Sequence, residues 1–124
     1  MDTRRKILTP EAARALRVPS LAMATGYFDI LRADHARALA DLRQRTGAAT
    51  LLAVVLPWKN ALLEGRARSE MAAALRMVDY VVSIDESDLS ALAAVLQPVE
   101  LLRLEAVECR RARELAEHVR RPQP

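Results

Sequence analysis

Residues 26–35, with the sequence GYFDILRADH, place an acid, an arginine and a histidine where an apolar run passes into a segment of helical period. Asp29, Arg32 and His35 are side chains that can orient, clamp or hydrogen-bond an anion. Such a junction can hold a phosphate, because the amino end of a helix presents unpaired N–H groups and a partial positive charge. The same residues can also form an ordinary turn, so the elements around them have to be considered.

Short runs rich in Val, Leu and Ile alternate with segments of helical period along the chain. The runs are nearly continuous in apolar character, which is typical of strands covered on both faces. We predict strands at 20–25, 50–56, 79–84 and 99–105, and helices at 9–17, 34–46, 68–77, 88–96 and 107–120. Strands and helices alternating with short connections indicate a parallel sheet wound through right-handed crossovers. The predicted fold class is therefore α/β, with three α/β/α layers and about four to five strands.

Local signals support several of these boundaries. Thr9 and Pro10 are suited to the cap and first position of a short helix, and Gly47 stands where a helix stop is expected. Ser87 or Asp88 is the expected cap of the helix at 88–96. In a doubly wound sheet, ligands bind beyond the carboxyl ends of the strands. Since the first predicted strand ends at about residue 26, residues 26–35 lie at the carboxyl ends of the strands, where a ligand is expected.

Composition limits the classes of function. The 124 residues fit one domain, with a core at 20–120 and a frayed tail at 121–124. No apolar run approaches the roughly 20 residues of a membrane span, so we expect a cytoplasmic protein without a cleaved signal. A single cysteine, Cys109, and only two histidines argue against a disulfide or a metal site. The net charge of +3 and the arginines near the carboxyl end fit a solvated helix face better than a nucleic-acid interface.

Three blocks of sequence together resemble a known family. MATGYFDILRADHARAL looks like the opening signature of the cytidylyltransferase-like nucleotidyltransferases, in which G-x-F-D is followed by H-x-G-H. RSEMAAALRMVDYVVSIDES and LSALAAVLQPVELL resemble the middle of that domain, in the same order. The likeness covers about residues 6–102. Within the family it is greatest to the adenylyltransferase domain of ADP-heptose synthase and to glycerol-3-phosphate cytidylyltransferase.

The resemblance implies a Rossmann-like fold and a default reaction. A sugar phosphate or polyol phosphate attacks the α-phosphorus of CTP or ATP, with Mg as the accompanying ion, and pyrophosphate leaves. Such catalysis depends on positioning and on stabilising charge. Carried over by position, the motif gives His35 and Arg32 as catalytic residues. The implied nucleotide- and phosphate-binding set is Gly26, Tyr27, Phe28, Asp29, Asp34, Lys59 and Arg68.

The sequence departs from the family where the chemistry is concentrated. Arg32 replaces the first motif histidine and Asp34 replaces the motif glycine. At roughly 4 Å, the Asp34 carboxylate and a phosphate would repel by about 4 kcal/mol at an effective dielectric near 20, whereas Asp34 is a good helix N-cap. Lys59 matches the family lysine only loosely, Arg68 is in register, and no I-S-S-T-x-x-R segment follows. The predicted site is therefore filled by its own acidic side chain, Asp34.

Single residues have two interpretations each. His35 is either a phosphate ligand or a structural residue, and Asp29 either orients Arg32 or His35 or satisfies backbone donors in the turn. Trp58 either closes a strand over the core, which we favour, or stacks on a base or partner. The acidic turn of Asp85, Glu86 and Asp88 fits helix capping better than a metal.

We favour a degenerate nucleotidyltransferase-like domain that is catalytically impaired and retained for binding or dimerisation. An active enzyme and a basic nucleic-acid module are the alternatives. No cofactor is expected in the impaired form, whereas the active form would use CTP or ATP with Mg. A homodimer or another protein is the expected partner, nucleotide binding is expected to be weak or absent, and neither a membrane nor nucleic acid is expected to be a partner.

Overall fold

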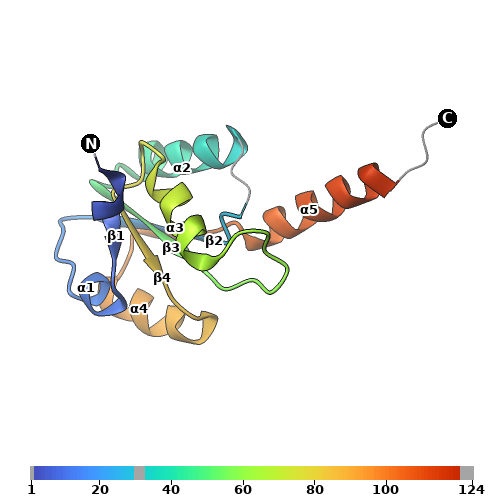
Figure 1. Ribbon diagram of the computed structural model, residues 1–124. Helices are drawn as coiled ribbons and strands as arrows, with labels where there is room; N and C mark the ends of the chain where they lie inside the picture. Colours follow the sequence, from blue (N-terminus) through green and yellow to red (C-terminus); the bar gives the residue numbers. More distant parts are fainter. Residues whose placement is uncertain (1, 30–32, 121–124) are drawn as a thin grey trace.

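A parallel β-sheet forms the centre of the computed structural model, which describes residues 2–29 and 33–120, although not the side chains of 111, 112 and 115–120 (Figure 1). The elements are η1 (Thr3–Lys6), β1 (Ile7–Leu8), α1 (Pro10–Arg14), β2 (Leu21–Gly26), α2 (Ala33–Thr46), β3 (Thr50–Val55), α3 (Gly65–Ala73), β4 (Tyr80–Ser83), η2 (Glu86–Asp88), α4 (Leu89–Leu96), β5 (Glu100–Arg103) and α5 (Glu105–Arg120). Here η denotes a 3-10 helix. The predicted α/β fold is confirmed.

The strand order is β1-β4-β3-β2-β5, and every described pairing is parallel. The chain moves outward from β2 to β3 and β4, then returns through α4 to place β5 on the other side of β2. Thr25 consequently has Val54 of β3 on one side and Arg103 of β5 on the other. The crossovers diverge between β2 and β5, where α/β sheets of this kind bind ligands.

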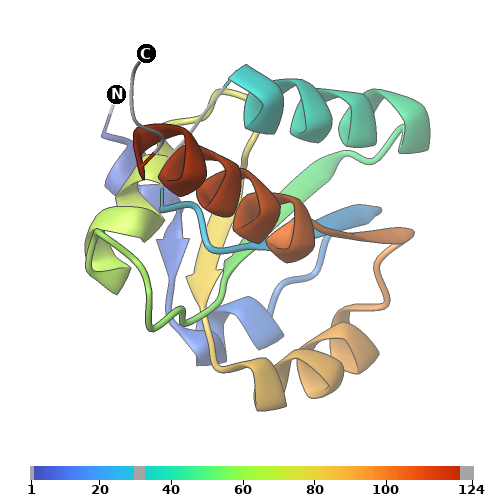
Figure 2. The ribbon, with the colours of Figure 1, turned by 90° about the vertical axis from the view of Figure 1, so that its right-hand side faces the viewer.

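Alternating side chains of each strand pack on opposite faces of the sheet. Ala22 and Ala24 of β2 join a cluster that includes Leu39 of α2 and Ala72 of α3. Met23 lies in a second cluster with the buried residues of α1 and α4. Figure 2 shows the resulting layers, with α2 on one side of the sheet and α1 and α4 on the other. The nearly continuous apolar strands of the sequence are explained by this burial on both faces.

The first strand was missed by the sequence patterns. Ile7–Leu8 is only two residues long and pairs with Val81 and Val82 of β4, so it carries no periodic signal. The helix predicted at 9–17 is shorter than expected, at Pro10–Arg14, although Thr9 caps it by accepting a hydrogen bond from the Ala12 amide at 3.1 Å. Pro19 disfavours helical geometry at the residue before it, which helps to explain the early end.

Other boundaries differ by a few residues. The helix predicted at 68–77 is α3, which spans Gly65–Ala73. Of the two residues expected to cap the helix at 88–96, Asp88 is the N-cap residue of α4, although its side chain makes no capping hydrogen bond. Ser87 lies within η2. Gly47 was predicted correctly: its φ of +67° lies in the left-handed region that ends a helix. The last strand and helix are Glu100–Arg103 and Glu105–Arg120 rather than 99–105 and 107–120.

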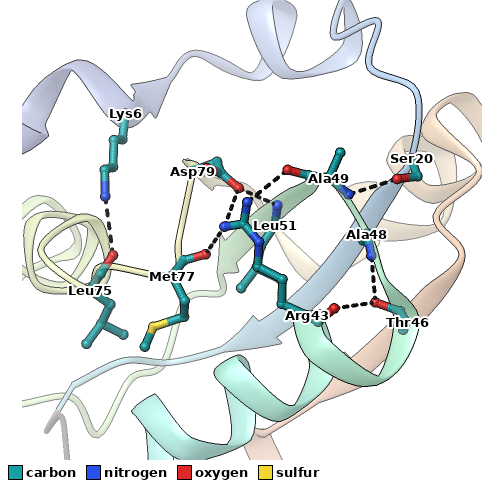
Figure 3. Close-up of polar contacts among 10 residues, drawn as sticks. All are labelled: Lys6, Ser20, Arg43, Thr46, Ala48, Ala49, Leu51, Leu75, Met77 and Asp79. Atoms are coloured by element: carbon teal, nitrogen blue, oxygen red, sulfur yellow. Dashed lines mark hydrogen bonds and ion pairs between the residues drawn. The ribbon is translucent and has the colours of Figure 1, made fainter.

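Arg43 contacts the segments at the amino ends of β3 and β4, opposite the strand ends where a ligand is expected (Figure 3). Its guanidinium donates to the carbonyls of Met77 and Ala49 at 3.0 and 2.9 Å and lies 3.0 Å from the Asp79 carboxylate. Asp79 in turn accepts a hydrogen bond from the Leu51 amide at 2.8 Å. These contacts join α2 to the segments that enter β3 and β4. They fix the amino ends of these two strands relative to α2.

The last helix, α5, begins beside β2 and extends away from the sheet (Figure 1). Its start is fixed by a backbone hydrogen bond from Leu104 to the Thr25 carbonyl, at 2.9 Å. The first turns of α5 are therefore placed next to the carboxyl end of β2. Within the described part of the chain, no helix has the length and apolar character needed to cross a membrane.

Candidate functional site

The carboxyl end of β2 carries a pair of backbone amides that hold one carboxylate. Tyr27 N–H donates to Oε1 of Glu108 and Phe28 N–H donates to Oε2, each at 2.8 Å. Two successive N–H groups converging on one anion form a nest of the kind that binds phosphates and other anions. Here the anion belongs to the protein itself, because Glu108 comes from the first turns of α5.

His35 lies at the same carboxylate. Its Nε2 is 3.5 Å from Oε2 of Glu108, and both side chains are only 7% exposed. His35 belongs to the first turn of α2, so residues from β2, α2 and α5 meet at this point. We call the Tyr27 and Phe28 amides together with His35 the anion cradle. Its geometry suits a group with two acceptor oxygens.

Two backbone features distinguish the turn that holds the Glu108 carboxylate. A Cβ at Gly26 would lie 2.5 Å from Oε1 of Glu108 and 3.1 Å from Cε2 of Phe28, so any side chain there would collide with the carboxylate. Phe28 has a φ of +52°, which is unusual for a residue other than glycine. Such conformations cost roughly 1–3 kcal/mol and cluster at functional sites. The fully buried Phe28 side chain helps to hold this one in place.

Asp29 supports a loop. Its two carboxylate oxygens accept hydrogen bonds from the amides of Leu62 and Leu63, each at 2.8 Å. Those residues belong to the segment between β3 and α3, more than thirty positions away. Of the two predicted interpretations, the structure agrees with the one in which Asp29 satisfies backbone donors, although the donors lie in a different loop.

Arg68 joins the ends of two strands. Its Nη1 donates to the carbonyl of Tyr27 at 3.0 Å and to that of Leu56 at 2.8 Å, and the side chain is buried. The Nε of Arg68 is buried without a hydrogen-bond partner. The guanidinium that the resemblance assigns to phosphate binding is thus directed in part to main-chain oxygens.

The remaining predicted residues have other surroundings or lie outside the described structure. Asp34 lies one position before His35, is partly exposed, and forms an ion pair with Arg37 at 2.5 Å. Lys59 is exposed in the turn after β3. Arg32 lies outside the described residues. Catalytic and nucleotide-binding roles for these residues therefore stay predictions.

Aromatic and acidic side chains border the cradle. Trp58 stacks on Tyr27 with ring centroids 4.8 Å apart and an angle of 16° between the rings. Burial raises the pKa of the Tyr27 phenol, and Cys109, Glu105 and Glu86 act in the same direction. The Tyr27 phenol is therefore held in its neutral form beside Trp58.

Two acidic side chains near the carboxyl ends of the strands, Glu86 and Glu105, bind the same arginine. Arg103 forms ion pairs with Glu86 and, at 3.0 Å, with Glu105. Among the residues that the structure describes, no group of three or more His, Cys, Asp or Glu side chains could hold a metal ion. The ion pair between Glu86 and Arg103 connects the acidic turn after β4 to β5.

Comparisons with known proteins agree with the architecture. No family profile matches the chain, and no curated protein matches it. The structure is similar to a crystal structure of a lipopolysaccharide core biosynthesis protein from Thermoplasma volcanium, with a TM-score of 0.60 and 24% sequence identity. The match covers 66% of this chain and 71% of that one. The chain shares the fold of that protein, an α/β Rossmann-like fold.

Sequence reasoning missed Glu108, because no motif includes it. The signal that could have found it is positional. Glu108 lies in the first turn of the helix after the fourth predicted strand, and the Glu108 amide binds the Leu104 carbonyl at 3.0 Å. In a doubly wound sheet, that strand lies beside the first one, so the helix after it starts next to Gly26. An acidic residue in that turn is placed to meet the amides after β2.

Replacement of Asp29 by asparagine is expected to destabilise the protein by about 1–3 kcal/mol, since an amide has a single acceptor oxygen and one of the two loop N–H groups loses its partner. Urea unfolding measures the change. Asp41→Asn is the matched control, because Asp41 is exposed on α2, and it is expected to change stability by less than about 0.5 kcal/mol. Equal effects of the two substitutions would contradict the role of Asp29.

Proposed function

We propose that the chain is a nucleotidyltransferase-like domain that is catalytically impaired and is retained for binding another protein or a second copy of itself. The observation that carries this proposal is the Glu108 carboxylate on the amides of Tyr27 and Phe28. The resemblance assigns the same two residues to phosphate binding. At roughly 4 Å from that carboxylate a nucleotide phosphate would be repelled by about 4 kcal/mol at an effective dielectric near 20.

The charges available to a nucleotide support the same proposal. Arg68 donates to two carbonyls and Asp29 accepts from two amides, so both side chains stabilise the carboxyl ends of the strands. Phosphoryl-group chemistry depends on cationic groups preorganised around the transition state. The contacts of Arg68 and Asp29 favour stability of the strand ends over binding of a triphosphate.

Exposed apolar side chains in and near β5 support retention for binding. Val95, Val99 and Leu101 are 51%, 58% and 36% exposed, and two of them precede or belong to β5. In the described part of the chain, β5 pairs with β2 and lies at the end of the sheet order. Edge strands with exposed apolar side chains are favourable places for association.

One observation favours the alternative function, an active enzyme that transfers CMP or AMP from CTP or ATP to a sugar or polyol phosphate. His35 remains at the anion cradle, where a family histidine is expected. Similarity to a lipopolysaccharide core biosynthesis protein is also compatible with a biosynthetic origin. The impaired form remains favoured because His35 faces a carboxylate of the protein.

A pyrophosphate-release assay tests the proposal. The protein is incubated with CTP or ATP, Mg²⁺ and a panel of sugar and polyol phosphates. We expect no turnover above background. The double variant Arg32→His/Asp34→Gly, which restores the family motif, is expected to show no nucleotide affinity by calorimetry while Glu108 remains. Turnover by the unaltered protein would contradict the proposal.

Light scattering tests the binding role. A mass of twice 13.8 kDa would support pairing of two copies, and a mass of 13.8 kDa would direct the search to a different protein. Leu101→Lys is expected to shift any dimer toward monomer, because a charge would enter the exposed surface of β5. Ser90→Lys on the exposed surface of α4 is the matched control and is expected to leave the mass unchanged.

A further inference from the structure

We propose that Glu108 is an internal ligand of an oxoanion site and that α5 controls access to that site. This inference rests on the proposed function and adds a means of regulation to it. When α5 carries Glu108 away, the anion cradle becomes available to a small oxoanion, such as a phosphate or a carboxylate group. The occupant that is present in the structure is the carboxylate of the chain itself.

The contacts of Glu108 are those of a bound ligand. Each oxygen takes one main-chain N–H at 2.8 Å, so the carboxylate is held at two points, and His35 Nε2 lies 3.5 Å from one of them. Burial of both ionisable side chains strengthens these interactions. Gly26 supplies space that a Cβ would remove. The site is therefore shaped around an anion, and the anion is attached to a separate helix.

The class of ligand follows from the donors. Paired N–H groups and an imidazole bind carboxylate and phosphate oxygens through charge-assisted hydrogen bonds. The two amides donate to two separate oxygens of one carboxylate, so the site selects charge and oxygen geometry. A free phosphate and a carboxylate group share this chemistry, and the two are separated by experiment.

The position of α5 links the site to the rest of the helix. Glu108 lies near the start of α5, beside β2, whereas the later turns extend away from the sheet (Figure 1). A partner that rotates or pulls α5 would withdraw the carboxylate and open the cradle. By thermodynamic linkage, an oxoanion that fills the cradle would favour release of α5 to the same extent.

The test uses the ¹⁵N-labelled chain and follows the amide resonances of Tyr27 and Phe28 while inorganic phosphate or acetate is added at constant ionic strength. The variants are Glu108→Ala and Glu108→Gln, and the matched control is Glu114→Ala, which removes an exposed glutamate from the same helix. We expect saturable shifts in both Glu108 variants. The unaltered chain and Glu114→Ala should bind at least about tenfold more weakly, since a site open in 10% of molecules or fewer loses that factor in apparent affinity.

Each outcome bears on the inference. Folded Glu108 variants whose amides do not respond to either anion would overturn it, as would equal affinities in the unaltered chain and the variants. If Glu108→Ala is unfolded, recovery of its structure on addition of phosphate or acetate supports the inference. Failure of both variants to fold at saturating anion would contradict the claim that a separate anion can replace the side chain. Response to phosphate alone identifies a phosphate site, and response to both identifies a general oxoanion site.

The inference and the proposed function can fail separately. Turnover of CTP or ATP by the unaltered chain would remove the proposed function, whatever the variants bind. An inert protein whose Glu108 variants ignore both anions would remove the inference and leave the proposed function in place.

Discussion

Gly26→Ala is expected to lower the free energy of unfolding by about 2–4 kcal/mol, through overpacking and the weakening of two charge-assisted hydrogen bonds. The new methyl group would lie 2.5 Å from Oε1 of Glu108, so the carboxylate has to shift and its hydrogen bonds with the amides of Tyr27 and Phe28 are distorted. Phe28 Cε2, at 3.1 Å, leaves little room on the other side. Urea unfolding followed by circular dichroism measures the effect.

Two controls separate the collision with Glu108 from a general effect of the added methyl group. Gly47→Ala meets nothing within 4 Å and is strained only by its positive φ, so about 1–2 kcal/mol is expected. In a Glu108→Ala background, Gly26→Ala should cost about 1–3 kcal/mol less than in the unaltered chain, because the colliding oxygen is gone. Costs that simply add would show that Glu108 does not occupy the space beside Gly26.

Arg68→Met is expected to destabilise the chain by about 2–4 kcal/mol. The substitution leaves the partly buried carbonyl of Tyr27 and the buried carbonyl of Leu56 without their charged donor, which costs roughly 1.5–3 kcal/mol for each hydrogen bond. Removal of the unpartnered Nε, a burial penalty of roughly 1–3 kcal/mol, offsets part of that loss. Chemical unfolding gives the net value.

Arg66→Met is the matched control for Arg68. Arg66 lies on the same helix, 77% exposed, and its ion pair with Glu70 is open to solvent. Such pairs contribute little, so a change below about 0.5 kcal/mol is expected. Arg68 would instead be assigned to ligand binding by two results together. Arg68→Met would have a small effect on stability, and adding Arg68→Met to the Glu108→Ala variant would abolish the anion binding of that variant.

Much of the fold could be predicted from the sequence, because the buried strands leave a strong signal. Leu51 to Val55 has no polar interruption, and both faces of β3 are covered by helices. Gly47 marked the end of α2 through its backbone conformation. The two-residue strand Ile7–Leu8 gave no such signal, since its place depends on pairing with β4 and not on its own pattern.

The candidate site was predictable in position and not in its contents. The turn at 27–29 follows β2, as the motif indicated, and amides in that turn hold the Glu108 carboxylate. The sequence suggested Asp34 as the acid that fills the site, because Asp34 lies within the motif. The structure places the carboxylate of Glu108 on the amides of Tyr27 and Phe28, from a residue about eighty positions away. Only the packing of β5 against β2 brings the two segments together.

The partners of Asp29 and Arg68 could not be predicted for the same reason. Their partners lie in other elements, and a pattern of residue types cannot show which main-chain groups a side chain will meet. Asp29 binds amides of the loop before α3, and Arg68 binds carbonyls after β2 and β3. Polar side chains that resemble a catalytic motif can thus stabilise the strand ends that the motif occupies.

The most direct test of the account is a titration of the unaltered protein with CTP and with ATP, each with Mg²⁺, while the amide resonances of Tyr27 and Phe28 are followed by NMR. If Glu108 holds those amides in place of a phosphate, neither resonance should show a saturable shift at about 1 mM nucleotide, the upper end of usual KM values. A saturable shift of both resonances, with a crystal structure showing nucleotide phosphates on the two amides and Glu108 displaced, would contradict it.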